Sequence, residues 1–199
     1  MKKQQPSVPP VHSDLRAATS HLHRRLDARL PFFTTDIAVY RRIMQAYYGF
    51  YLPFETLLAA SASTIPGMGW AQRLKTPILK QDLLALGLTF GEIDALPLCK
   101  ILPGVETQAQ ALGALYVVEG ATLGGQVLRG IIKAKVGVES ATGGAFMDVY
   151  GAETRNLWQG FLTCLSCIQE PEDIAQTVAI AQQTFICFEG WLEQSDVLQ

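Results

Sequence analysis

The chain has 199 residues, a length that suits one domain with a sizeable buried core. Charged residues make up only 17% of it, fewer than the roughly 25% of an average domain, which is compatible with an internal apolar surface that receives a ligand. The net charge of −2 offers no electrostatic basis for binding nucleic acid. No stretch approaches the roughly 20 uninterrupted apolar residues of a membrane span. The N-terminus lacks the apolar segment of a signal peptide, so we expect a cytoplasmic protein.

The first part of the chain divides into a tail and a helix. Residues 1–12 are expected to form a flexible N-terminal tail, because they are rich in proline and polar groups, and residues 13–199 to form one domain. Ser13 or Asp14 is expected to cap a first helix over about 14–28.

The middle of the chain predicts two further helices. A capping cluster at 34–36 precedes a long helical pattern over about 37–63, which Pro53 is expected to interrupt and kink. A third pattern covers about 72–86, and a loop rich in glycine, proline and aspartate follows it.

Three more helices are predicted in the second half, over about 107–135, 152–168 and 171–195. A glycine-rich loop at 137–144 separates the first two, and Pro171 is a favourable first-turn residue for the last. No alternating strand pairs or hairpin turns occur. The sequence therefore predicts an all-α, single-domain multi-helix bundle.

Histidine is scarce, so any histidine chemistry must use His12, His21 or His23. The apolar stripe of the first predicted helix consists of Leu15, Ala18, Leu22 and Leu26. On a helical wheel His23 lies at the edge of this stripe beside Thr19, whereas His21 falls on the other flank and is expected to face water. No Glu-x-x-His pair or Gly-x-Ser-x-Gly motif is present, which excludes a di-iron bundle and argues against a serine hydrolase.

Arg16 lies seven residues before His23, about 10 Å away on the same helix face. An imidazole and a guanidinium so placed suit a porphyrin, whose iron would bind the imidazole and whose propionate would meet the cation. The alternative is a histidine at the edge of the surface and an ordinary arginine.

Glycines accumulate in the predicted helix 107–135. Gly113, Gly120 and Gly124 share one face, and Gly125 is adjacent, although each glycine costs a helix about 1 kcal/mol relative to alanine. Two interpretations stay open: another helix packs closely against this face, or a flat ligand lies against the backbone.

The four cysteines are interpreted as ordinary buried thiols. Cys164 and Cys167 form a CxxC, but no second CxxC and no following histidine completes a zinc site.

Two segments carry a resemblance to heme oxygenases. Residues 15–23, LRAATSHLH, resemble the proximal-helix motif of that family, and residues 112–126, LGALYVVEGATLGGQ, resemble its distal helix. Weaker similarities occur at 48–55 and 185–191. The sequence of the distal segment most resembles the bacterial enzymes associated with bacteriophytochromes.

The resemblance implies site residues and an activity. It makes His23 the iron ligand and Arg16 a propionate contact, and it brings Gly120 and Gly124 close to bound dioxygen. The remaining heme contacts that we expect are Thr19, Glu119 and Gly125. The implied reaction cleaves heme, as substrate and cofactor at once, to biliverdin, carbon monoxide and ferrous iron. It consumes dioxygen and electrons from an external donor, and a bacteriophytochrome would receive the bilin.

Alternatives from other classes are a heme-binding or bilin-handling protein without turnover, and a helical bundle that binds no heme. The first is suggested by Ala121, which stands where the animal enzymes carry an aspartate that orders water near dioxygen. Glu119 is nearby but about 100° around the helix. Arg155 is the only cation of the predicted helix 152–168, so Arg16 is the one propionate contact that we expect.

Overall fold

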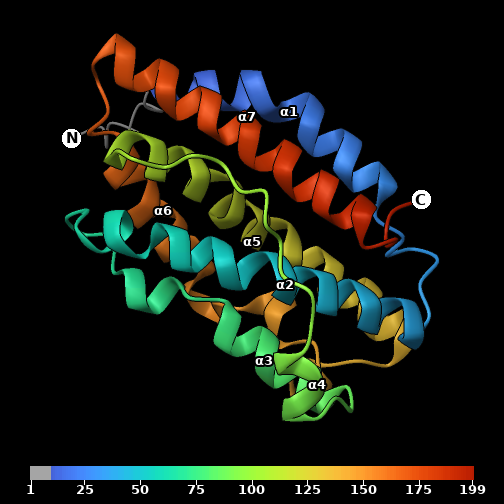
Figure 1. The fold of residues 1–199 in the computed structure, drawn as a ribbon. Coiled ribbons are helices and arrows are strands. Elements are labelled where there is room, and N and C mark those ends of the chain that lie inside the picture. The colour runs from blue at the N-terminus through green and yellow to red at the C-terminus, as the bar shows by residue number, and fades with distance from the viewer. Residues whose placement is uncertain (1–9) are drawn as a thin grey trace, which may run out of the picture.

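The computed structural model describes residues 10–199, which form a helical bundle without strands in that range (Figure 1). Its helices are α1 (Pro10–Arg29), α2 (Ile37–Ser63), α3 (Thr76–Ala85), α4 (Phe90–Asp94), α5 (Gln108–Val136), α6 (Thr154–Leu165) and α7 (Pro171–Gln194). Short 3-10 turns occupy Trp70–Arg73, Ser140–Thr142, Ala145–Asp148 and Gly151–Glu153. The predicted all-α class is therefore confirmed.

Helix α1 begins earlier than the sequence predicted. It starts at Pro10, so Ser13 and Asp14 lie within the helix and do not cap it, and the last residues of the predicted tail are helical. Proline is favourable in a first turn, and Val11 is completely buried, which anchors this turn to the core. The rest of the predicted tail, 1–9, lies outside the described residues.

Helix α2 is capped by Asp36, whose carboxylate accepts a hydrogen bond from the Val39 amide at 2.8 Å. The expected interruption at Pro53 was wrong, because α2 continues through it to Ser63. Proline has no N–H to donate to the carbonyl of Gly49, four residues earlier. That carbonyl instead accepts the amide of Cys99 at 2.9 Å, so the helix leaves no backbone acceptor unpaired there.

Two segments contain more structure than predicted. The single helix expected at 72–86 is a 3-10 turn followed by α3, which takes Pro77 in its first turn. The loop expected after it contains α4, because Thr89 and Glu92 form a reciprocal capping box. The predicted glycine-rich loop contains one of the 3-10 turns.

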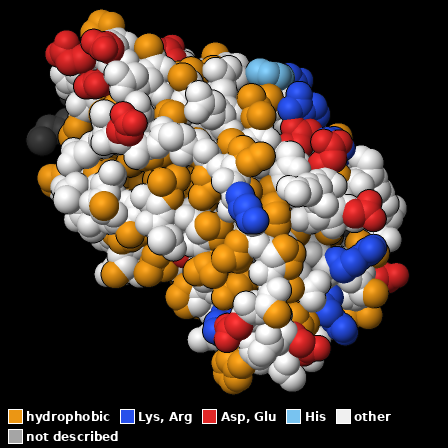
Figure 2. Space-filling view, viewed as in Figure 1, with side chains coloured by type: hydrophobic (Ala, Val, Ile, Leu, Met, Phe, Trp, Pro, Cys, Tyr) orange, Lys and Arg blue, Asp and Glu red, His pale blue; other side chains and the backbone are white. Residues whose placement is uncertain are grey.

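Helix α5 crosses the molecule beneath α1 and α7, which lie side by side, and α2 passes in front of it (Figure 1). Within the described residues, α5 is the one helix long and apolar enough to span a membrane, and 56% of its most apolar window is buried inside the bundle. On the face shown in Figure 2, hydrophobic side chains reach the surface between scattered charged ones.

The pairing of α1 with α7 includes ion pairs from Arg25 and Arg29 to the buried Glu189, with the nitrogen atoms 3.0 and 2.9 Å from its oxygens. Burial alone would raise the pKa of Glu189, but the hydrogen bonds from both arginines outweigh it and hold the pKa below its ordinary value. The paired carboxylate therefore stabilises the fold above the ordinary glutamate pKa of about 4.3 and loses this contribution as the pH falls through the lowered value.

We accordingly expect Glu189→Gln to lower the melting temperature at pH 7, with the difference from the parent shrinking below about pH 4. Thermal unfolding followed by circular dichroism across this pH range tests the effect. Glu193→Gln is the matched control, since Glu193 pairs with Arg29 but is 65% exposed. An equal effect of the two substitutions at every pH would contradict the assignment.

Candidate functional site

An apolar cavity lies between α1, α2, α5 and α7. Its volume is about 330 Å³, within the range of small-molecule pockets, and it is open to solvent on one side. Phe33 and Val127 at its edge are 64% and 69% exposed, so the cavity has an open mouth. Representative residues of its apolar wall are Leu26, Phe32, Phe50, Val118, Leu128 and Phe185.

His23 of α1 borders this cavity. Its Nδ1 is 2.8 Å from a carboxylate oxygen of Asp27, one helical turn further on, and its ring packs edge-on against Phe185 with the centroids 6.0 Å apart. The hydrogen bond to Asp27 raises the pKa of His23 above its ordinary value, against the opposing effect of burial. A carboxylate at Nδ1 fixes the ring and leaves Nε2 available to a ligand, which is the usual arrangement of a metal-binding histidine.

The other two histidines do not line the cavity. His21 is exposed on α1, as the helical wheel predicted, but His23 is exposed too: its side chain is 55% exposed although it borders the cavity. His12 is half-buried between the rings of Tyr116 and Trp158, and burial and the nearby Arg16 lower its pKa.

Helix α5 forms the wall opposite α1, and Ala121, Thr122, Gly124 and Gly125 contribute to it. A Cβ atom at Gly124 would meet no atom within 4 Å, so this glycine leaves free space in the cavity. A Cβ atom at Gly125 would overlap the carbonyl of Met147, so that glycine lets the 3-10 turn Ala145–Asp148 approach α5.

The remaining glycines of the stripe contact other elements. At Gly113 a Cβ atom would overlap the backbone of Thr177, which shows why α5 and α7 can pack so closely. At Gly120 it would meet the ring of Trp158 in α6 at 3.9 Å, an ordinary contact distance. The packing interpretation is confirmed for Gly113 and Gly125. Gly124 and Gly125 border the cavity, and the ligand interpretation stays a prediction there.

Four of the expected heme contacts are not part of the cavity wall: Arg16, Thr19, Glu119 and Gly120. Arg16 is exposed on α1, two turns before His23. Thr19 is buried, and its hydroxyl donates to the carbonyl of Leu15 at 2.7 Å. His23, Gly124 and Gly125 are the expected site residues that the structure brings together at the cavity.

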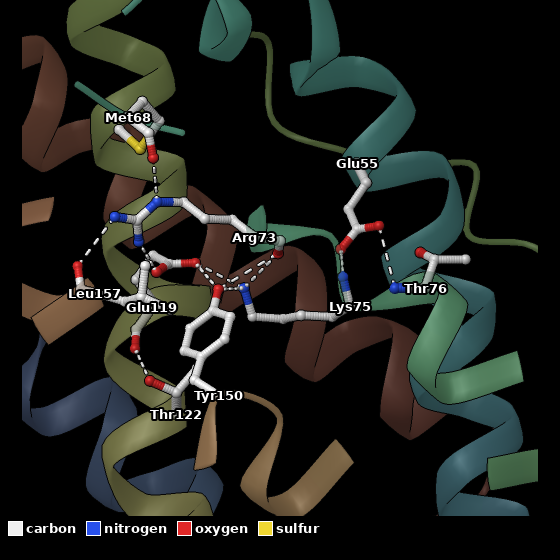
Figure 3. A network of polar contacts seen from close by, with 9 residues as sticks. All are labelled: Glu55, Met68, Arg73, Lys75, Thr76, Glu119, Thr122, Tyr150 and Leu157. Carbon is white, nitrogen blue, oxygen red and sulfur yellow. Dashed lines mark hydrogen bonds and ion pairs between the residues drawn. The ribbon is translucent and has the colours of Figure 1, made fainter. Parts of the chain in front are cut away.

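Glu119 belongs instead to a buried polar network behind the wall (Figure 3). Its carboxylate accepts hydrogen bonds from Arg73, from Lys75 at 2.7 Å and from the Tyr150 hydroxyl at 2.8 Å. Burial and the adjacent Glu119 carboxylate raise the pKa of Tyr150, which keeps its hydroxyl a neutral donor. Lys75 also lines the cavity, so one member of the network borders it.

Sequence reasoning missed Arg73, Lys75 and Tyr150, and also a buried carboxylate that holds the backbone of Lys75. Glu55 of α2 accepts hydrogen bonds from the backbone amides of Lys75 at 2.6 Å and Thr76 at 3.2 Å, at the beginning of α3. A negative charge is favourable at that helix end. The weak similarity at 48–55 was the one sequence signal near this group.

Two tyrosines of α2, Tyr47 and Tyr51, also line the cavity and were not expected. Burial raises the pKa of both hydroxyl groups, so they are neutral at physiological pH. Their rings lie against Phe146 at centroid distances of 5.6 and 5.3 Å. They contribute aromatic rings and neutral hydroxyl groups to a cavity whose other lining side chains are mostly aliphatic or phenylalanine.

These features define a class: helical-bundle proteins with an apolar cavity bordered by a histidine. A model of the heme oxygenase family matches residues 10–194, so the chain belongs to the heme oxygenase family. A curated heme oxygenase of Xanthomonas campestris pv. campestris (strain 8004) is 31% identical over 98 residues, which are 49% of this chain and 55% of that protein. The chain thus aligns with about half the length of this relative.

Solved structures agree with the fold. A heme oxygenase from Leptospira interrogans has a TM-score of 0.76 at 18% identity, covering 92% of this chain and 98% of that one. The heme oxygenase from Neisseria meningitidis, solved with NO and CO bound, has a TM-score of 0.74 at 19% identity, covering 93% and 91%. Heme oxygenase-1 from Synechocystis sp. PCC6803, in complex with heme, has a TM-score of 0.74 at 13% identity, covering 94% and 92%.

Proposed function

We propose that this protein binds heme in the cavity between α1 and α5 and cleaves it to biliverdin, carbon monoxide and ferrous iron. The observation that carries the proposal is the geometry of His23, which borders the apolar cavity with Nδ1 held by Asp27 and, among residues 10–199, no hydrogen-bond partner at Nε2. A carboxylate at Nδ1 fixes the tautomer that would present Nε2 to iron, and iron binding would displace the Nε2 proton that the raised pKa of His23 favours. Family membership and the fold support the same activity.

The residues of the cavity would have different roles. Bound heme would supply the iron at which dioxygen is activated. His23 would hold it from the α1 side, and the aromatic and aliphatic wall would exclude bulk water from the ring. Gly124, whose missing side chain leaves space against α5, would let the backbone approach the open face of the ring. The hydroxyl groups of Tyr47 and Tyr51 would offer neutral hydrogen bonds inside the cavity.

The proposed reaction consumes dioxygen and electrons from an external donor. The proposal also includes a bacteriophytochrome that receives the bilin and a cytoplasmic location. These parts rest on the sequence resemblance. In the proposed function, Gly120 and Glu119 lie next to the cavity wall and do not form it. Gly120 faces Trp158, and Glu119 lies in the polar network behind the wall.

A spectroscopic titration tests the proposal. Adding hemin to the purified protein should produce an intense Soret band that saturates at one equivalent, and reductant with dioxygen should convert the complex to biliverdin. No Soret shift would exclude a heme-binding function, and a stable complex without ring opening would identify a heme-binding protein without turnover. Carbon monoxide release, measured in the same reaction, distinguishes oxygenase chemistry from bleaching by peroxide.

Arg16 provides a separate prediction about the edge of the ring. A propionate that extends from the cavity toward solvent could meet this exposed guanidinium, two turns from His23. We expect Arg16→Glu to weaken hemin binding by about tenfold, because one partly solvated charge-assisted contact becomes repulsive. Hemin affinity and the biliverdin isomer ratio are the measurements. If both are unchanged in Arg16→Glu, this arginine does not contact the ligand.

A further inference from the structure

A buried carboxylate of α3 holds a turn that lines the cavity. Asp82 is 2% exposed, and its two carboxylate oxygens accept hydrogen bonds from the backbone amides of Ala145 at 3.0 Å and Phe146 at 2.7 Å. Because both oxygens accept, the side chain acts here in its ionised form. The two amides belong to the 3-10 turn Ala145–Asp148, whose Phe146 and Met147 line the cavity. Asp82 itself lies outside the cavity wall.

The charge of Asp82 is costly where it lies. Among residues 10–199 no cation forms an ion pair with it, so the two backbone amides are the contacts that stabilise the charge. Burial raises the pKa of Asp82, against the opposing effect of these two hydrogen bonds. A buried carboxylate without a cation contributes little to overall stability. Its contribution is therefore sought in the position of the turn that it holds.

Two neighbouring contacts fix the same segment. Gly143 has a φ of +111°, and a Cβ atom there would come within 2.6 Å of the Leu86 side chain, so glycine lets the chain pass close to the end of α3. The buried Tyr40 of α2 donates its hydroxyl to the Gly143 carbonyl at 3.0 Å. The turn is thus anchored to α3 through Asp82 and, just before it begins, to α2.

The same turn supports the second half of α5, residues 121–136, which contributes one wall of the cavity. Gly125 and Ile132 are the only buried residues of this half, whereas most residues of the first half are buried. Within residues 10–199, the side-chain hydrogen bonds and ion pairs from this half to other elements all run to the segment 139–154. The position of the α5 wall therefore depends on that segment.

The contacts between α5 and the turn are close. The carbonyl of Met147 occupies the place where Gly125 lacks a side chain. Arg129 forms an ion pair with Asp148, the last residue of the turn. The Gln126 side chain donates to the Gly151 carbonyl at 3.3 Å. A displacement of the turn would either move this wall or leave it without support.

We propose that Asp82 is a positioning residue: by fixing the turn Ala145–Asp148 it holds the second half of α5 in place, and so determines how a planar ligand is seated in the cavity. Where it concerns the ligand, this inference rests on the proposed function, because it requires heme in the cavity. The seating of the ring decides which of its edges faces the space beside Gly124. Asp82 would thereby influence which biliverdin isomer forms, although it does not touch the ring.

The first experiment uses the apo protein. Asp82→Asn keeps the size of the side chain, but it offers one acceptor oxygen and turns an NH2 group toward the other backbone N–H. Hydrogen–deuterium exchange should become faster by about fivefold or more at 145–146 and also in 121–136, as expected for the loss of about one hydrogen bond. Exchange in 108–119 should be unchanged. The melting temperature should fall by less than about 5 °C, because the buried charge is removed as well.

The second experiment uses the hemin complex. Asp82→Asn should transfer hemin to a heme-scavenging protein faster, and should shift the biliverdin isomer ratio, each by about threefold or more. Gly125→Ala displaces the same turn from the α5 side, because its methyl group would overlap the Met147 carbonyl, and it should shift the ratio too. Since both substitutions act through one turn, the shift in the double variant should be smaller than the product of the single shifts.

Asp94→Asn is the matched control, because it makes the same chemical change at a residue of α4 that is 64% exposed and pairs with Lys80. It should leave exchange, hemin transfer and the isomer ratio unchanged. In Asp82→Asn, faster exchange confined to 145–146 would overturn the link to α5. Faster exchange of 121–136 with unchanged hemin transfer and isomer ratio would overturn the role in seating the ligand and leave the proposed function intact.

A parent protein that gave no hemin complex would overturn the proposed function and the part of this inference that concerns the ligand. The exchange measurement on the apo protein would still decide whether Asp82 positions α5.

Discussion

His23→Ala should lose the histidine-ligated spectrum of the hemin complex and nearly all ring opening. The apolar wall would still attract the porphyrin, so hemin binding should be weakened but not abolished. Without the imidazole the iron has no protein ligand on the α1 side, and turnover should fall by a factor of about 100 or more. Resonance Raman or magnetic circular dichroism of the complex identifies the axial ligand, and biliverdin formation measures turnover. Added imidazole should restore part of both signals.

His21→Ala is the matched control, since His21 lies on the same helix two residues earlier but outside the cavity wall. We expect it to bind hemin as the parent does. Asp27→Asn adds a graded case: it keeps the side chain's size but removes the charge that polarises Nδ1, so the iron–histidine bond should weaken without disappearing. Loss of the histidine-ligated spectrum in His21→Ala alone would contradict the assignment.

Local sequence signals predicted most of the fold. Helices α5 and α7 were predicted within one residue at each end, because Thr107 with Gln110 forms a capping box, Gly137 ends α5 in a left-handed conformation, and Pro171 opens α7. The errors arose where tertiary contacts override local rules. Pro53 remains inside a helix because the carbonyl that it leaves free, that of Gly49, accepts a hydrogen bond from the amide of Cys99 in a distant loop.

Local sequence signals also predicted part of the candidate site. Helical periodicity placed His23 beside the core, and the i, i+4 spacing of Asp27 was a local signal for the carboxylate at Nδ1 that went unused. The partners of Glu119 were not predictable from any local pattern, because Arg73 and Lys75 are separated from it by 46 and 44 residues. Helical phase alone suggested one shared role for the glycines, but a helix meets different neighbours along its length.

The glycines of α5 give the second large expected effect. Gly124→Leu should leave the apo protein folded, since a side chain there meets no atom within 4 Å and leucine favours helix by about 1 kcal/mol over glycine. Filling the cavity beside α5 should nevertheless displace the ring or block its open face. Turnover of the hemin complex is therefore expected to fall about a hundredfold. The apo melting temperature and the single-turnover rate are the paired measurements.

Two glycines of the same helix complete the test. Gly130 also has open space around it but does not line the cavity, so Gly130→Leu should retain both stability and turnover. Gly113→Ala should do the reverse of Gly124→Leu: its methyl group would overlap the Thr177 backbone, which cannot move without separating α5 from α7, and stability should fall by about 1–3 kcal/mol. The folded fraction of Gly113→Ala should still turn over hemin. Normal turnover in Gly124→Leu would show that the ring does not lie against this part of α5, because the cavity could not hold both the leucine side chain and the porphyrin there.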